Sequence, residues 1–184
     1  MSRDQDCRVK LVGNSEQAEI GQFLDPASKI ILLTDLPKAL AGLRRPLVFT
    51  NGVFDILHAG HVHYLAQARA LGGSLVVALN SDTSTRLLGK GPDRPINGEG
   101  DRALVLAALQ AVDLVTVFSE QTPLAVLALI RPDMYVKGGD YDIEQLAETR
   151  LVRSWGGTAQ ALPFVEGRST TGLLTRLRSS RVAS

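Results

Sequence analysis

The sequence predicts an α/β fold, in which a single domain is built on a doubly wound parallel sheet. Short apolar runs such as "PLVFT" and "SLVVALN" alternate along the chain with longer segments of helical spacing. Such alternation is typical of parallel strands joined by right-handed crossovers. The runs are continuously apolar rather than alternating, so helices should cover both faces of the sheet. Ligands of such sheets bind beyond the carboxyl ends of the strands, where the strand order reverses.

The predicted strands are buried runs that end at turn residues. Asn51-Gly52 ends the first strand, and a glycine loop ends the fourth. The strands are expected at 46–50, 74–80, 113–118, 133–139 and, as a short last strand, 158–162.

The predicted helices lie between these strands and carry their own end signals. Thr34 or Asp35 caps the first helix, Gly72-Gly73 stops the second, and Thr122 caps the fourth with Pro123 in its first turn. Helices are expected at 34–43, 60–71, 100–111, 122–130 and 143–155, with a last one from about Ser169 to Arg178. The polar start has no clear pattern, so we divide the chain into an N-terminal extension, 1–30, and a domain, 31–184.

Composition excludes several classes of protein. A chain of 184 residues with a net charge of +1 and scattered basic residues suits one globular domain without a nucleic-acid partner. Cys7 is the only cysteine, so no internal disulfide can form. The start has no secretory signal, and no apolar run is long enough to cross a bilayer. We therefore expect a cytoplasmic protein with no membrane partner.

All three histidines, His58, His61 and His63, fall within six positions after the first strand. His58 and His61 flank Gly60 at a helix start, where residues three apart project to one side and free amides favour an anion. Gly60 would let a phosphate approach the backbone. We favour a phosphate site over two open alternatives, a structural turn and a metal site; the latter lacks a nearby Cys and the i, i+4 spacing. His63 is interpreted as structural.

Hydroxyl and basic side chains give a second signal. The segment 169–171, "STT", starts the last predicted helix, where a plain cap is the simplest interpretation and a phosphate cradle the alternative. Arg168 beside it could add charge-assisted bonds. Basic residues recur in predicted loops and strand ends, namely Lys90, Arg94, Arg102 and Lys137. Together they indicate an anion as large as a triphosphate. The sequence has neither a P-loop nor a GxGxxG turn, so this anion would be bound in another way.

The motifs "GVFDILHAGH" and "GRSTT" resemble the nucleotidyltransferase superfamily with an HxGH signature and an STT-like motif, over about residues 47–177. The stretches "FTNGVFDILHAGHVHYL", "NSD", "GPDRPIN", "VKGGDY" and "EGRSTT" are most similar to the adenylyltransferase family of ADP-heptose synthesis. The resemblance implies a Rossmann-like fold and transfer of AMP from ATP to D-glycero-β-D-manno-heptose 1-phosphate, for lipopolysaccharide core synthesis. Many relatives carry a fused sugar kinase, and we expect the stand-alone form here.

The resemblance also implies roles for individual residues. The expected catalytic residues are His58, His61, Lys90 and Arg102. Those expected to bind the nucleotide are Asn51, Gly52, Val53, Phe54, Gly60, Asn80, Asp82, Ser169, Thr170 and Thr171. Those expected at the sugar phosphate are Asp55, Arg94, Lys137, Gly138 and Asp140, with Asp55 also bracing its loop. Mg²⁺ should enter with ATP and without a direct protein ligand, although Asp55 could order the ion or its water.

Two positions depart from the family pattern, and the acceptor stays open. Val53 stands where the subfamily often has Cys, which suggests that this thiol is not catalytic. Gly73 stands where the superfamily usually has Asp, which we interpret as a structural change. The same motifs also serve cytidylyltransferases for glycerol 3-phosphate or phosphoethanolamine and adenylyltransferases for FMN. A non-catalytic nucleotide-binding module is a further alternative. From the resemblance we expect ATP and a sugar 1-phosphate as ligands and a homo-oligomer as the assembly.

Overall fold

Five parallel strands form one sheet, with bounds close to those predicted. The computed structural model describes residues 24–89, 91, 93–139 and 142–163. The strands are β1 (Leu47–Gly52), β2 (Ser74–Asn80), β3 (Leu114–Phe118), β4 (Met134–Gly138) and β5 (Thr158–Leu162). Their order across the sheet is β3-β2-β1-β4-β5. The predicted parallel α/β architecture is therefore confirmed.

The strand order reverses between β1 and β4. From β1 the chain moves outward through β2 to β3 and then returns to place β4 on the other side of β1. The β1–β4 pairing aligns Phe49 with Tyr135. The crevice outside the carboxyl ends of β1 and β4 is thus the switch point, where sheets of this kind bind their ligands.

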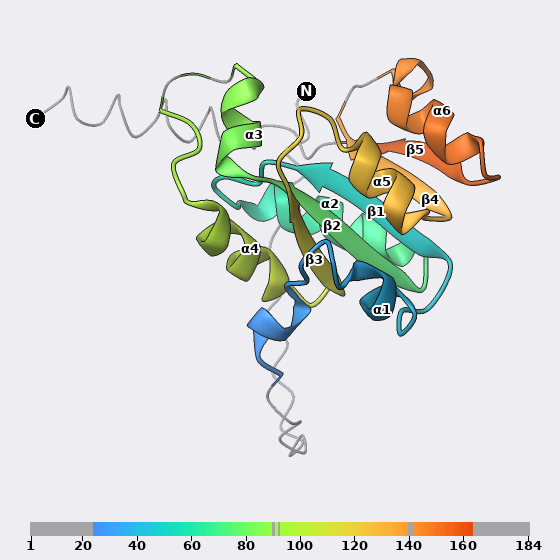
Figure 1. Ribbon diagram of the computed structural model, residues 1–184, viewed down its shortest axis with the longest axis horizontal. Helices are drawn as coiled ribbons and strands as arrows, with labels where there is room; N and C mark the ends of the chain where they lie inside the picture. Colours follow the sequence, from blue (N-terminus) through green and yellow to red (C-terminus); the bar gives the residue numbers. More distant parts are fainter. Residues whose placement is uncertain (1–23, 90, 92, 140–141, 164–184) are drawn as a thin grey trace, which may run out of the picture.

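Helices cover both faces of the sheet, as the continuous apolar strands predicted (Figure 1). On one face, α2 (Ala59–Ala70) and α4 (Glu99–Ala107) pack on inward side chains such as Val48 and Val77. On the other, α1 (Leu36–Leu40), α5 (Leu124–Ile130) and α6 (Ala147–Arg153) pack on the alternate residues, including Phe49 and Val76. Each strand of the centre is therefore buried on both sides.

Some predicted helix bounds are wrong. The fourth helix has Pro123, not Thr122, at its N-cap position. The segment expected as one helix over 143–155 is a 3₁₀ turn, η2 (Ile143–Gln145), an extended Leu146, and then α6. The third predicted helix ends at Ala107 rather than at 111. A short helix, α3 (Asp82–Leu87), was not expected. The helix predicted from Ser169 lies outside the described residues.

The described part of the predicted N-terminal extension lies on the domain. The 3₁₀ turn η1 (Pro26–Lys29) is followed by Ile30, which forms a parallel bridge with Val115 of β3. Lys29 Nζ donates to the carbonyl oxygen of Val112 at 2.9 Å. The division at residue 30 remains a prediction.

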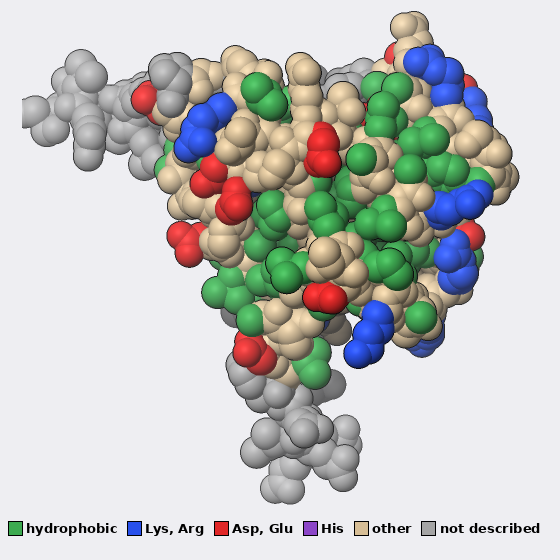
Figure 2. All heavy atoms as spheres, in the orientation of Figure 1, with side chains coloured by type: hydrophobic (Ala, Val, Ile, Leu, Met, Phe, Trp, Pro, Cys, Tyr) green, Lys and Arg blue, Asp and Glu red, His purple; other side chains and the backbone are tan. Residues whose placement is uncertain are grey.

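The surface over α1 and α5 is mixed in character. Figure 2 shows apolar side chains gathered near the centre of this face, with Lys and Arg side chains toward its right-hand edge. Leu129 of α5 is 45% exposed. Within the described residues, no helix combines the length and apolar character that a bilayer crossing requires.

Candidate active site

The carboxyl edge of the sheet collects the polar residues that the sequence singled out. Asn51 and Gly52 end β1, Asn80 ends β2, and Lys137 and Gly138 end β4. Lys137 Nζ donates to the backbone oxygen of Asn51 at 3.3 Å and to its Oδ1 at 3.2 Å. The bond spans the β1–β4 switch point, so these residues lie where the fold predicts a ligand.

His58 and His61 lie together at the start of α2. His58 is the N-cap residue and His61 is the third helical residue. The backbone N–H of His58 donates to Nδ1 of His61 at 3.4 Å. The two rings stack with centroids 4.0 Å apart and planes 31° apart. This is a capping box in which histidine takes the place of the usual Glu or Gln.

Burial and the neighbouring His58 lower the pKa of His61 from 6.5 to about 4. His61 is therefore neutral near pH 7. Its Nδ1 accepts the bond from His58, so the single ring proton lies on Nε2. A neutral imidazole with Nε2–H is a hydrogen-bond donor without charge, suited to an oxygen of a phosphate.

Phe54 shapes the loop between β1 and α2. It adopts a left-handed conformation with φ of 46°, which is uncommon for a bulky residue. Its ring lies edge-on to His61, with centroids 5.5 Å apart, and is 8% exposed. A Cβ on Gly52 would come within 3.0 Å of this ring. A side chain at position 52 would therefore crowd the Phe54 ring, which forms one wall around His61.

Asp55 braces the loop that precedes α4. Its carboxylate accepts the backbone N–H groups of Ile96, at 2.8 Å, and Asn97, at 2.9 Å. Arg94 forms an ion pair with it at 2.8 Å, and the carboxylate is fully buried. The Asn97 side chain returns a bond to the Asp55 carbonyl at 2.7 Å. Both carboxylate oxygens are engaged, which agrees with the bracing role expected for Asp55.

Arg102 is buried, only 1% exposed, and joins several segments. Its guanidinium donates to the carbonyls of Val53 at 2.6 Å, Asn80 at 3.0 Å and Asn97 at 2.9 Å. A fourth bond, at 2.6 Å, reaches the Asp82 carboxylate. These contacts make Arg102 a brace between the β1 loop, the end of β2 and the start of α4, and its catalytic role stays a prediction.

The end of β2 is held by the same network. Asn80 donates from Nδ2 to Ser84 Oγ at 2.9 Å, inside α3. Asp82 opens α3, and its backbone N–H donates to Glu99 of α4 at 2.7 Å. Both side chains, predicted to bind the nucleotide, are used within the fold. Gly60 is buried in the first turn of α2.

Two residues of this edge were not predicted as part of the site. Asn97 lies in the quoted stretch "GPDRPIN", but its bonds to Asp55 depend on long-range contacts. Tyr135 donates from Oη to Asn51 Oδ1 at 3.2 Å. Its place in an apolar strand gave no signal beyond that of a core residue. The predicted site residues Lys90, Asp140, Ser169, Thr170 and Thr171 lie outside the described residues.

A cavity of about 460 Å³ adjoins the carboxyl edge. Phe54 and Leu57 from the β1 loop, together with Asp101, Leu104 and Val105 of α4, form part of its wall. Leu104 and Val105 are about half exposed, at 45% and 50%. The cavity gives room for a ligand beside the braced loop.

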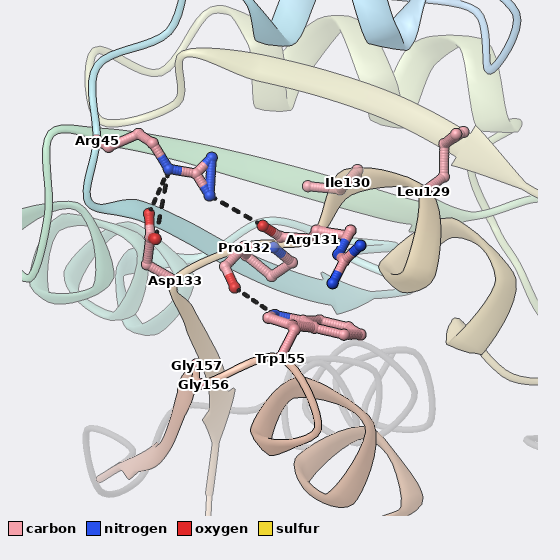
Figure 3. Close-up of a pocket in the computed structure, with 9 residues that line it drawn as sticks. All are labelled: Arg45, Leu129, Ile130, Arg131, Pro132, Asp133, Trp155, Gly156 and Gly157. Atoms are coloured by element: carbon pink, nitrogen blue, oxygen red, sulfur yellow. Dashed lines mark hydrogen bonds and ion pairs between the residues drawn. The ribbon is translucent and has the colours of Figure 1, made fainter.

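A second cavity, of about 450 Å³, lies at the opposite, amino edge of the sheet (Figure 3). Arg45 forms an ion pair with Asp133 at 3.0 Å, and Arg131 lies 5.5 Å over the ring of Trp155. The Trp155 indole donates to Pro132 at 3.0 Å. These bonds fasten the entries of β1 and β4, so the polar groups here serve the fold.

The cytidylyltransferase-like family model matches residues 49–166, which include most of β1, the His58–His61 turn and β5. D-β-D-heptose 1-phosphate adenylyltransferase of Bordetella bronchiseptica is 60% identical over 153 residues, covering 82% of this chain and 94% of that relative. The bifunctional protein HldE of Geotalea uraniireducens is 47% identical over 150 residues, covering 82% of this chain and 30% of that relative. The chain thus spans nearly all of one relative and about a third of the other.

The solved structures agree on the fold. A lipopolysaccharide core biosynthesis protein from Thermoplasma volcanium superposes with a TM-score of 0.56 at 30% identity, covering 66% of this chain and 98% of that one. A pantoate-β-alanine ligase from Francisella tularensis has a TM-score of 0.51 at 14% identity, covering 77% and 69%, and shows the fold alone. The chain therefore belongs to the cytidylyltransferase-like family and is a nucleotidyltransferase.

Proposed function

We propose that the protein transfers AMP from ATP to D-glycero-β-D-manno-heptose 1-phosphate, giving ADP-heptose and pyrophosphate. The observation that carries the proposal is the joint presence of the paired histidines at the switch-point edge and 60% identity to a heptose 1-phosphate adenylyltransferase. The aligned region covers 82% of this chain and 94% of that relative. We further propose that the product feeds lipopolysaccharide core synthesis in the cytoplasm and that the enzyme is a homo-oligomer.

In the proposed reaction an oxygen of the sugar 1-phosphate attacks the α-phosphorus of ATP in line. The bond from that phosphorus to the bridging oxygen breaks, and pyrophosphate leaves with the bond's electron pair. No group of the protein needs to form a covalent bond, so catalysis depends on orientation and charge stabilisation. His61 donates from Nε2 to a phosphoryl oxygen, while the stacked His58 and the first amides of α2 bind the same triphosphate.

Mg²⁺ would neutralise the triphosphate and favour departure of pyrophosphate. Among the described residues no cluster of three or more His, Cys, Asp or Glu side chains could hold a metal ion. Asp55 already accepts bonds from Arg94, Ile96 and Asn97. We therefore propose that Mg²⁺ arrives with ATP and is held mainly by phosphate oxygens and water.

A matrix of nucleotides and acceptors tests the proposed substrate pair. Pyrophosphate release should be measured with ATP or CTP, Mg²⁺, and heptose 1-phosphate, glycerol 3-phosphate, phosphoethanolamine or FMN. We expect release with ATP and heptose 1-phosphate and far slower release with every other pair. Preferred use of CTP with glycerol 3-phosphate or phosphoethanolamine, or of ATP with FMN, would assign another reaction of the family. Nucleotide binding without turnover on any acceptor would favour a binding module.

His61→Ala tests the proposed chemistry. Loss of a preorganised donor to a reacting phosphoryl group should lower kcat by about 10²–10³-fold or more. His63→Ala is the matched control, because His63 is exposed on the same helix and should retain parental turnover. Circular dichroism should show that both variants fold. Turnover of the His61 variant within a few-fold of the parent would remove His61 from the mechanism.

A further inference from the structure

Tyr135 and Asn51 form a polar pair at the switch point that no catalytic step above uses. Phe49 and Tyr135 are aligned partners of β1 and β4, and Asn51 and Lys137 lie two residues further along each strand. Side chains two apart on a strand point to the same face. The register therefore brings Tyr135, Asn51 and Lys137 together at the crevice between these strands.

The contacts fix the orientation of the Asn51 carboxamide. Lys137 Nζ lies 3.2 Å from Asn51 Oδ1, and Tyr135 Oη lies 3.2 Å from the same atom. An ammonium group only donates hydrogen bonds, so the atom that faces Lys137 must be the oxygen. Tyr135 must then donate to that oxygen as well. The Nδ2 group of Asn51 is thereby turned to the other side.

The two N–H bonds of Asn51 Nδ2 have no acceptor among the described residues, although Asn51 is only 9% exposed. A donor held in a fixed direction next to an ammonium group suits an anionic oxygen. Tyr135 is completely buried, with its ring 6.1 Å from that of Phe49, so its hydroxyl has little freedom. The second anchor of the carboxamide is therefore rigid, whereas the lysine chain is flexible.

We propose that Tyr135 is a positioning residue that orients Asn51 to donate its amide hydrogens to the phosphate of the acceptor sugar 1-phosphate. The inference rests on the proposed function and adds a specific contact for the acceptor phosphate. Tyr135 does not touch the substrate and acts through Asn51. Asn51, predicted from the resemblance to bind the nucleotide, is thereby assigned to the acceptor.

Tyr135→Phe removes one hydroxyl and keeps the ring. We expect the KM for the sugar 1-phosphate to rise about three- to tenfold, as for loss of one oriented hydrogen bond, with the KM for ATP changed less than about twofold. Tyr64→Phe is the matched control. Its hydroxyl is also buried, bonded to Thr50 at 2.6 Å and Val136 at 3.1 Å, but serves α2 packing. The control should lower stability without changing the KM for the sugar phosphate.

A double-mutant cycle separates positioning from general damage to the fold. If Tyr135 acts through Asn51, Tyr135→Phe should have no further effect on the sugar-phosphate KM in an Asn51→Ala background. Independent, multiplying effects of the two substitutions would overturn the inference, as would a parental KM in Tyr135→Phe. Calorimetric titration with the sugar 1-phosphate gives a second readout. If the parent protein neither binds nor converts the sugar 1-phosphate, the proposed function is refuted as well. If the parent turns it over normally and Tyr135→Phe has the parental KM, only this inference is refuted.

Discussion

At the scale of single residues, the protonation state of His61 links stability to function. Burial and the nearby His58 lower its pKa to about 4, so the folded protein keeps this ring neutral over a pH range in which the unfolded chain would protonate it. The same neutral state places the ring proton on Nε2 and leaves Nδ1 to cap α2. One side chain thus serves both the helix start and the proposed phosphate contact.

The sign of the pH effect follows from these values. Between about pH 6.5 and pH 4 the unfolded chain binds a proton at His61 that the folded protein does not, so the free energy of unfolding falls as the pH falls through this window. Urea unfolding at a series of pH values should show a shallower decline for His61→Asn than for the parent. His63→Asn, on the exposed face of α2, should retain the parental slope. Equal slopes in parent and His61→Asn would contradict the buried neutral state.

At the scale of elements, the β1–α2 loop is held by contacts on both sides. Phe54 packs on His61, and a Cβ on Gly52 would make a tight contact, 3.0 Å, with the Phe54 ring. On the other side, Asp55 and Arg102 fasten the loop to residues 94–97 and to α4. These contacts hold the turn that we propose binds phosphate, and such preorganisation would lower the entropic cost of binding.

Gly52→Ala should disturb this loop. The new Cβ would press on the Phe54 ring at 3.0 Å and displace it from His61, so kcat/KM should fall about tenfold or more. Gly100→Ala is the matched control, since a Cβ there meets nothing within 4 Å and the residue lies exposed in α4. The control should stabilise the protein by about 0.5–1 kcal/mol and leave kcat/KM unchanged. Parental kcat/KM in Gly52→Ala would show that the Phe54 wall is dispensable.

Arg102→Lys should lower the free energy of unfolding by about 2–4 kcal/mol, because one ammonium group cannot reach the four acceptors that the guanidinium now pairs. Urea unfolding measures the loss. Arg86→Lys, on the exposed side of α3, should change stability by less than about 0.5 kcal/mol. A loss at Arg102 no larger than that at Arg86 would argue against the brace.

At the scale of the whole molecule, the β3-β2-β1-β4-β5 order explains why the polar ends of three strands meet at one edge. The order places Asn51 beside Lys137, and Asn80, the last residue of β2, lies at the same edge. The other edge, with Arg45, Asp133 and Trp155, fastens the strand entries. The proposed ligand site thus lies at the carboxyl edge, whereas the described contacts at the amino edge join the strand entries.

The sequence predicted this architecture well where burial alone decides the structure. Continuous apolar runs such as Leu75–Leu79, bounded by turn residues, favour buried strands, and all five predicted strands are present. The helix α3 was missed because "DTSTRL" has no apolar periodicity; Ser81 caps it and Asn80 bonds to Ser84. The Ser81 cap was a local signal, but without apolar periodicity after it no helix was predicted.

The candidate site was predicted in part. The spacing of His58 and His61 was enough to place both at one helix start. The partners of Arg102 come from residues 53, 80, 82 and 97, and this convergence requires the folded sheet. Tyr135 was overlooked because an aromatic residue in a strand is usually part of the core. Its hydrogen bond to Asn51 becomes visible only when β1 and β4 are paired.

The central claim is that the triphosphate lies against the His58–His61 turn at the β1–β4 switch point. A crystal structure with Mg²⁺ and a non-hydrolysable ATP analogue tests it most directly. The account predicts a phosphate oxygen within hydrogen-bonding distance of His61 Nε2 and the sugar-phosphate side of the site open toward Asn51. A triphosphate bound instead at the amino edge, beside Arg45 and Arg131, would contradict it.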